Sequence, residues 1–168
     1  RQSGFHGILV SISNPADVIA HYLQYLLSWP AGKIISTGTA LDSARLRRVT
    51  AEAEGVSIED AEGYALGEHG KSQIAAWSTI SIQGRALSEL REENKEKYGR
   101  IDWELLAGEV RGGGWIILEG KGSTEFGIGA ALAEVVRAVW EGKGTILPVS
   151  TLLNGEYGQH GVYASVPV

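Results

Sequence analysis

The chain has 168 residues, of which 43% are hydrophobic and 21% are charged, and these proportions of a globular protein exclude the disordered and fibrous classes. Its net charge of −5 is spread along the sequence without a basic stripe, so we expect no nucleic acid partner. The absence of cysteine excludes a disulfide framework and is compatible with a reducing compartment, and the apolar runs are too short to cross a membrane.

The N-terminal segment predicts a strand, a helix and a second strand. Residues 7–13 (GILVSIS) form a nearly continuous apolar run, which is typical of a strand buried on both faces. Residues 16–28 carry apolar side chains at helical spacing, and a short apolar run follows at 33–36. This order is that of a parallel βαβ unit. No G-x-G-x-x-G follows any predicted strand, so if this is a dinucleotide-binding fold, its first half is missing.

The next segment predicts a helix and a pair of strands. The helix extends from about residue 39 to 54 and stops at Gly55, a common C-terminal signal. We expect two strands in the stretch that ends at Ile82, joined through GEHGKSQ. The polar residues 83–100 are expected to form a loop region.

Two further helices and two strands are predicted in the remainder of the chain. One helix runs from about Ile101 to Arg111 and is interrupted by the glycines at 112–114. A longer helix with an apolar face covers 124–142. The closing strands, at 144–151 and 161–168, are separated by the turn-rich NGEYGQHG.

Three residues form a candidate set for acid/base chemistry. Asp42 and Arg45 are three apart in the predicted helix and share a face. A solvent-exposed ion pair is the simpler interpretation; alternatively, the arginine holds a substrate carboxylate and the aspartate orients a charged imidazole. His69 lies in a glycine-rich turn and is either a turn residue or a proton carrier. Spacing alone does not choose between these interpretations.

Asn14 is a fourth candidate, because it follows the first predicted strand and precedes a proline. Its amide is either a turn signal or a hydrogen-bonding group for a substrate or cofactor at the carboxyl end of a parallel sheet. The four histidines show no H-E-x-x-H spacing, so we predict no metal site.

Five segments resemble the NAD-dependent L-lactate dehydrogenase family, in the order found there. They are ISNPADV (12–18), GTALDSARLR (38–47), GYALGEHGKSQIAAWS (63–78), LEGKGSTEFGIG (118–129) and TILPVSTLLNGEYG (145–158). SGFHGILV before the first segment, and KSQIAAWST within and after the third, resemble most closely the L-2-hydroxyisocaproate dehydrogenase branch. Malate dehydrogenases share the architecture but match these segments less well.

The resemblance implies an α+β catalytic domain of the lactate/malate dehydrogenase type, preceded by the last βαβ piece of a Rossmann α/β domain. Residues 1–38 would be the C-terminal remnant of the NAD-binding domain. Residues 39–168 would be the catalytic domain, truncated before its C-terminal helix. We therefore expect this chain to be a piece of a longer protein.

The resemblance also assigns roles at matching positions. His69 matches the catalytic acid/base, Asp42 its aspartate partner, and Arg45 the arginine that binds the substrate carboxylate. Asn14 matches an asparagine that contacts both substrate and the nicotinamide region of NAD. Thr124 matches a threonine that lines the substrate pocket, and Ile128 a residue near the nicotinamide.

The implied activity is reversible hydride transfer between NAD(H) and a 2-oxo or 2-hydroxy acid, in a cytoplasmic homo-oligomer, either a dimer or a tetramer. The isolated chain is expected to be inactive, because the glycine-rich cofactor loop and the mobile loop that sets substrate specificity are not in it. Two alternatives stay open: an L-malate dehydrogenase of the same fold, and a non-catalytic oligomerisation or binding module derived from it.

Overall fold

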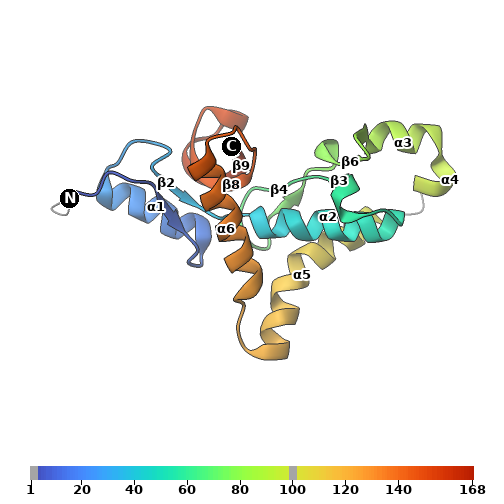
Figure 1. The fold of residues 1–168 in the computed structure, drawn as a ribbon, viewed down its shortest axis with the longest axis horizontal. Helices are drawn as coiled ribbons and strands as arrows, with labels where there is room; N and C mark the ends of the chain where they lie inside the picture. The colour runs from blue at the N-terminus through green and yellow to red at the C-terminus, as the bar shows by residue number, and fades with distance from the viewer. Residues whose placement is uncertain (1–3, 99–101) are drawn as a thin grey trace.

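The computed structural model describes residues 4–98 and 102–168, and its central element is a four-stranded sheet (Figure 1). The strand order is β1-β2-β8-β9, which comprises Leu9–Ser11, Ile34–Ser36, Pro148–Asn154 and His160–Pro167. Strands β1 and β2 pair in parallel and are joined through α1, Ala16–Leu27. The predicted βαβ unit is therefore confirmed. The predicted closing strands are confirmed as the antiparallel pair β8 and β9.

The first and last segments of the chain meet in this one sheet. Strand β8 pairs antiparallel with β2, with Ser36 opposite Ser150, and both serines are fully buried. The first strand, however, is shorter than expected and is only half-buried at Leu9 and Val10. The prediction of a strand buried on both faces was wrong, because β1 lies at the edge of this sheet and pairs only with β2.

Helix α2, Ala40–Glu54, confirms the helix predicted at 39–54. It ends at Gly55, which adopts the left-handed conformation and donates its N–H to the carbonyl groups of Ala51 and Glu52. The middle of the chain then forms five short strands. They are β3 (Ala61–Glu62), β6 (Ser81–Ile82) and β7 (Arg85–Ala86) in one sheet, and β4 (Ala65–Leu66) with β5 (Ile74–Ala75) in another.

Strands β4 and β5 are the antiparallel pair that we predicted on either side of GEHGKSQ. The loop predicted at 83–100 was wrong, since it contains α3 (Leu87–Glu93) and α4 (Lys95–Tyr98). Leu87 and Leu90, three apart, are both buried in the core, while the charged residues face solvent. This apolar spacing was hidden among polar residues. Residues 99 and 100 lie outside the described part of the chain.

The glycines at 112–114 do not interrupt a helix, contrary to our prediction. Helix α5 extends through them, from Trp103 to Lys121, and begins at Asp102, whose side chain accepts the N–H of Leu105 at 3.1 Å. Ile101, the predicted first residue, lies outside the described residues. Gly113 and Gly114 lie beside the side chain of Arg45, whereas a Cβ at Gly112 would meet nothing within 4 Å. The following helix α6, Phe126–Glu141, confirms the last predicted helix.

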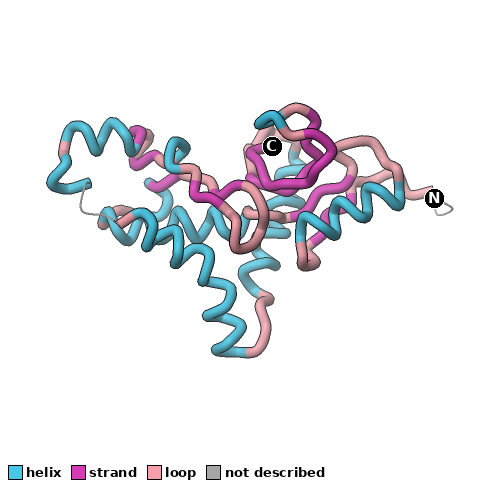
Figure 2. The backbone as a smooth tube through the Cα atoms, turned by 180° about the vertical axis from the view of Figure 1, so that it is seen from behind, coloured by secondary structure: helices cyan, strands magenta, loops and turns pink. Residues whose placement is uncertain are grey.

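Two apolar clusters hold these elements together. One contains Leu46 and Val49 of α2 with Ile80, Ile82, Leu87, Leu90, Trp103 and Val110, and the other contains Ile35, Ala40, Ala131, Val135 and Val149. Helix α2 contributes to both clusters and so connects the sheet to the helices α3 and α5. The helices α5 and α6 project together from the rest of the molecule (Figure 2). Within the described ranges, no helix combines the length and the apolar character needed to cross a membrane.

Candidate active site

The centre of the candidate site is Asp42, a carboxylate in the first turn of α2 that is only 2% exposed. Its Oδ1 accepts a hydrogen bond from Nη1 of Arg45 at 2.9 Å. Its Oδ2 lies 2.6 Å from Nδ1 of His69. Because the Arg45 side chain is only 14% exposed, the interpretation of a solvent-exposed ion pair was wrong. One buried carboxylate connects the arginine and the histidine that sequence reasoning selected.

Two hydroxyl groups, one just before α2 and one in its first turn, hold the strand β4, which precedes His69 in the chain. Thr39 donates its hydroxyl to the carbonyl oxygen of Ala65 at 2.5 Å, and Ser43 accepts the N–H of the same residue at 2.9 Å. Thr39 and Ser43 are both buried. These bonds satisfy the backbone polar groups of β4, which would otherwise be costly to bury. The position of β4 on α2 in turn brings the following loop back toward Asp42.

The loop that contains His69 is held by backbone hydrogen bonds at two residues, Gly67 and His69. Gly67 exchanges two backbone hydrogen bonds with Ser165 of β9, at 2.9 and 2.8 Å. Its φ of +89° is one that glycine adopts without strain. Two residues later, the backbone N–H of His69 donates to Oδ2 of Asp17 in α1 at 2.9 Å. The imidazole is therefore held by Asp42 while its own backbone is held by Asp17.

This environment raises the pKa of His69 above its ordinary value of 6.5. The largest cause is the hydrogen bond with Asp42, and the negative charges of Asp42 and Asp17 add to it. Burial and the positive charge of Arg45 act in the opposite direction. The protonated imidazole is favoured because two carboxylates face it while a single cation opposes it. The His69 side chain remains 26% exposed, so it is accessible to a ligand.

Arg45 also lines a pocket of about 190 Å³ between α2 and the junction of α5 and α6. The lining residues are Leu41, Arg45, Ile117, Lys121, Thr124, Glu125, Phe126, Gly127 and Ile128. Three predicted site residues, Arg45, Thr124 and Ile128, are thus brought together. His69 and Asn14 do not line this pocket. Arg45 connects the pocket to the pair of Asp42 and His69, because it lines the pocket and also donates a hydrogen bond to Asp42.

Asn14 is exposed and follows β1 at its carboxyl end. It precedes Asp17 by three residues, and Asp17 binds the backbone of His69. Asn14 therefore lies at the end of the sheet that carries the candidate site, and within residues 4–98 and 102–168 no hydrogen bond joins it to the other predicted site residues.

Sequence reasoning missed three residues that shape this site. Asp17 is a buried carboxylate, and it also accepts the hydroxyl of Ser150 at 2.5 Å. Gly113 passes Arg45 so closely that a Cβ there would lie 3.2 Å from its Cδ and Nε. The signals were available but ambiguous. An acidic residue in a first helical turn usually only stabilises the helix, and a serine in a buried strand or a glycine in an apolar helix has many causes.

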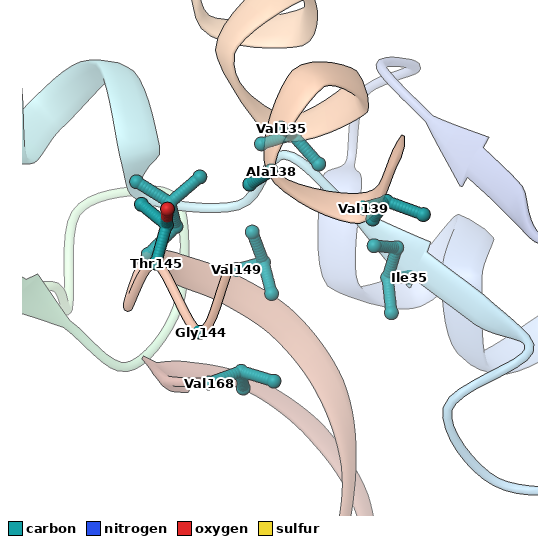
Figure 3. Close-up of a pocket in the computed structure, with 9 residues that line it drawn as sticks. Ile35, Val135, Ala138, Val139, Gly144, Thr145, Val149 and Val168 are labelled. Carbon is teal, nitrogen blue, oxygen red and sulfur yellow. The ribbon is translucent and has the colours of Figure 1, made fainter. Parts of the chain in front are cut away.

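A second pocket, of about 210 Å³, is separate from these residues (Figure 3). Its lining comes from β2, α6, β8 and the chain end, and comprises Ile35, Val135, Ala138, Val139, Gly144, Thr145, Leu147, Val149 and Val168. None of these side chains is a titratable acid or base. Within residues 4–98 and 102–168, no group of three His, Asp or Glu side chains is placed to hold a metal ion.

Comparison with known proteins agrees with the fold. The family model described as the lactate/malate dehydrogenase, alpha/beta C-terminal domain matches residues 39–168. An L-lactate dehydrogenase of Fusobacterium nucleatum subsp. nucleatum is 39% identical over 166 residues, covering 99% of this chain and 52% of that protein. The L-lactate dehydrogenase of Staphylococcus saprophyticus is 39% identical over 165 residues, covering 98% of this chain and 51% of that protein.

Solved structures give the same result. The minor L-lactate dehydrogenase of Enterococcus mundtii in its ligands-bound form is 36% identical with a TM-score of 0.89, and the match covers 99% of this chain and 52% of that one. A lactate dehydrogenase from a Medee basin deep-sea metagenome library is 32% identical with a TM-score of 0.90, covering 99% and 53%. The chain spans about half the length of these relatives and has the fold of their C-terminal half. It belongs to the lactate/malate dehydrogenase family.

Proposed function

We propose that this chain is the substrate-binding and acid/base portion of an NAD-dependent L-2-hydroxy acid dehydrogenase of the lactate type. The observation that carries the proposal is that one buried carboxylate, Asp42, binds both Arg45 and His69. In this proposal residues 1–38 are the end of the cofactor-binding domain and residues 39–168 are the catalytic domain. The reaction is the reversible conversion of a 2-oxo acid into an L-2-hydroxy acid.

Arg45 binds the carboxylate of the substrate. Its Nη1 is used by Asp42, and the guanidinium also lines the pocket that contains Thr124 and Ile128. An arginine can hold a carboxylate with two parallel hydrogen bonds, which fixes the orientation as well as the position of a small acid. The ion pair with Asp42 limits the conformations of the arginine, so less freedom is lost when the substrate binds.

His69 carries the proton. Since Nδ1 is directed at Asp42, Nε2 is the nitrogen that is available to the keto oxygen. The raised pKa favours the protonated imidazole, which donates a hydrogen bond and then a proton as the oxygen becomes negative. Asp42 stabilises the imidazolium before transfer. In the oxidative direction, neutral His69 accepts the proton of the hydroxyl group.

Two residues of this chain suit the nicotinamide end of NAD. Ile128 supplies a half-buried apolar side chain beside Arg45 and Thr124, and Asn14 supplies an exposed amide at the carboxyl end of β1, where cofactors bind to parallel sheets. When bound, NADH supplies the hydride. The remaining cofactor contacts require a form of the protein that reaches the length of its relatives.

We also propose a homo-oligomer, in the cytoplasm, as the resemblance implies. The support is the apolar surface of the two projecting helices α5 and α6 (Figure 1). Its exposed side chains include Leu105, Trp115, Ile116, Phe126, Val136, Val139 and Trp140, of which Phe126 is 82% and Trp140 is 89% exposed. An apolar surface of this extent is typical of a protein interface. Light scattering should give the mass of a dimer or tetramer, and Trp140→Asp should lower it.

Steady-state kinetics on the longer form test the proposed activity. We expect NADH oxidation with pyruvate or with the bulkier 2-oxoisocaproate, and none with the 168-residue chain alone. Oxaloacetate as the best substrate would indicate the malate dehydrogenase alternative. If the longer form turns over none of the three acids, the dehydrogenase proposal is wrong and a non-catalytic binding module takes its place.

A further inference from the structure

A buried carboxylate outside the predicted set joins three distant segments. Asp17 lies in the first turn of α1 and is 9% exposed. Its Oδ2 accepts the backbone N–H of His69, 52 positions away, at 2.9 Å, and its Oδ1 accepts the hydroxyl of Ser150, 133 positions away, at 2.5 Å. Burying a carboxylate costs free energy unless its oxygens are hydrogen-bonded, and both oxygens of Asp17 have a donor.

The contact matters because it falls on the histidine itself. His69 lies in a loop between the short strands β4 and β5, in which residues 67–72 are all exposed or half-buried. Gly67 is fixed to Ser165 two residues earlier. The bond from Asp17 fixes the backbone of His69, and the bond from Asp42 fixes its ring. If only the bond between Asp42 and the imidazole were present, movement of the His69 backbone would change the direction in which Nε2 points.

We propose that Asp17 is a positioning residue, which holds the backbone of His69 so that its imidazole stays on Asp42 with Nε2 available to the substrate. The proposal rests on the proposed function, since it gives His69 the role of proton carrier. Asp17 acts through His69 and is not itself expected to touch the substrate. Ser150, in the buried part of strand β8, donates its hydroxyl to Oδ1 of Asp17, the oxygen that His69 does not use.

Charge gives Asp17 a second effect on the same residue. Three charged side chains act on His69, namely Asp42 and Arg45 from α2 and Asp17 from α1. The loop that contains His69 carries two further charged residues, Glu68 and Lys71. Glu68 is engaged with the backbone N–H and hydroxyl of Ser72. The charge of Asp17 raises the pKa of His69, although less than the hydrogen bond with Asp42 does. Loss of the charge should therefore lower the pKa of His69 without abolishing the shift.

The experiment is NMR spectroscopy of the 168-residue chain, in which the imidazole of His69 is identified by its absence from the His69→Gln variant. Asp17→Asn keeps the size of the side chain and removes its charge and one acceptor. We expect a lower pKa of His69. We also expect hydrogen exchange of its backbone amide to be at least about tenfold faster, because a hydrogen bond to a charged acceptor is lost.

The matched control is Ser150→Ala, which leaves the bond between Asp17 and His69 in place. It should change the amide exchange rate by less than about twofold.

If Asp17→Asn leaves both the pKa and the amide exchange of His69 unchanged, Asp17 only ties α1 to β8 and the proposal is overturned. A second measurement needs no variant and covers the case in which Asp17→Asn does not fold. In the wild-type chain, the amide resonance of His69 should follow the titration of the Asp17 carboxyl carbon, because the two groups are hydrogen-bonded. An amide resonance that does not follow it also overturns the proposal. None of these measurements uses substrate or NADH, so absence of turnover in the longer form would sink the proposed function alone.

Discussion

The helices α2 and α6 have opposite relations between sequence and burial. In α2, eight of fifteen residues are buried, and they include the polar residues Asp42, Ser43, Thr50 and Glu54. In α6, only Ala131 and Val135 of sixteen residues are buried, although the helix is mostly apolar. A rule that places apolar residues inside the protein would have predicted α6 to be buried and α2 to be exposed.

Hydrogen-bond partners account for the burial of the site residues of α2, but not for Thr50 and Glu54, each of which has a buried side-chain oxygen without a hydrogen-bond partner among the described residues. The site residues of α2 can be buried because they pair, Asp42 with Arg45 and His69, and Ser43 with Ala65. The exposed apolar residues of α6 have no such cover within the described residues, which is why we assign them to an interface. The proposed roles follow the same division, since α2 carries the residues of the proposed chemistry and α6 carries the proposed assembly surface. The predictions below act on α2 and its neighbours.

The largest effect is expected from His69→Gln in the longer form. The substitution removes the proton carrier while leaving Asp42 and Arg45 in place, so kcat/KM for pyruvate should fall by about 10²- to 10⁴-fold. His160→Gln is the matched control, since His160 is exposed in β9 and lies outside the site. Equal activity of His69→Gln and wild type, measured by NADH absorbance, would show that another group transfers the proton.

A smaller loss is expected from Asp42→Asn, which removes a charge but retains a side chain of the same shape. The hydrogen bond with Asp42 is the largest cause of the raised pKa of His69, so the pKa should fall and a smaller fraction of the imidazole should be protonated at neutral pH. Reduction of pyruvate should then lose about 10²-fold in kcat/KM, and the pH profile should shift to lower pH. A profile that keeps the wild-type pH dependence would contradict the assigned role of Asp42.

The same pair makes stability depend on pH. The folded chain holds the proton of His69 more tightly than the unfolded chain, whose histidine has the ordinary pKa of 6.5. This stabilisation is therefore fully present below pH 6.5 and is lost as the pH rises through the raised pKa of the folded state. Comparison of thermal unfolding of wild type and His69→Gln should show the largest difference in Tm below pH 6.5. A difference that grows as the pH rises would contradict the direction of the shift.

Much of the site could be predicted from the sequence, because its chemistry depends on local residue types. The βαβ unit, α2 and the strand pair around His69 follow from periodicity and turn residues, and Asp42, Arg45 and His69 follow from a matching set of segments. Asp17 could not be assigned, because its partners are 52 and 133 positions away. A contact of this range has no local pattern. The loop expected at 83–100 failed for a related reason, since only Leu87 and Leu90 mark the buried face of α3.

The smallest effect concerns the glycines that were expected to break α5. Alanine favours a helix over glycine by about 1 kcal/mol, so Gly112→Ala should stabilise the chain, because a Cβ there meets nothing within 4 Å. Gly113→Ala gains the same helix propensity, but its Cβ would lie 3.2 Å from Cδ and Nε of Arg45. Arg45 must then shift by a few tenths of an ångström, and we expect this shift to disturb its ion pair with Asp42.

Thermal unfolding of the 168-residue chain should therefore rank Gly112→Ala above Gly113→Ala, and the KM of the longer form for pyruvate should rise only in the second variant. The comparison separates two uses of glycine in one helix. If both alanines stabilise the chain equally and leave KM unchanged, Arg45 adapts without cost and Gly113 has no role in shaping the site. If only Gly113→Ala raises KM, the glycine is retained there because the backbone of α5 forms the wall against which the arginine is held.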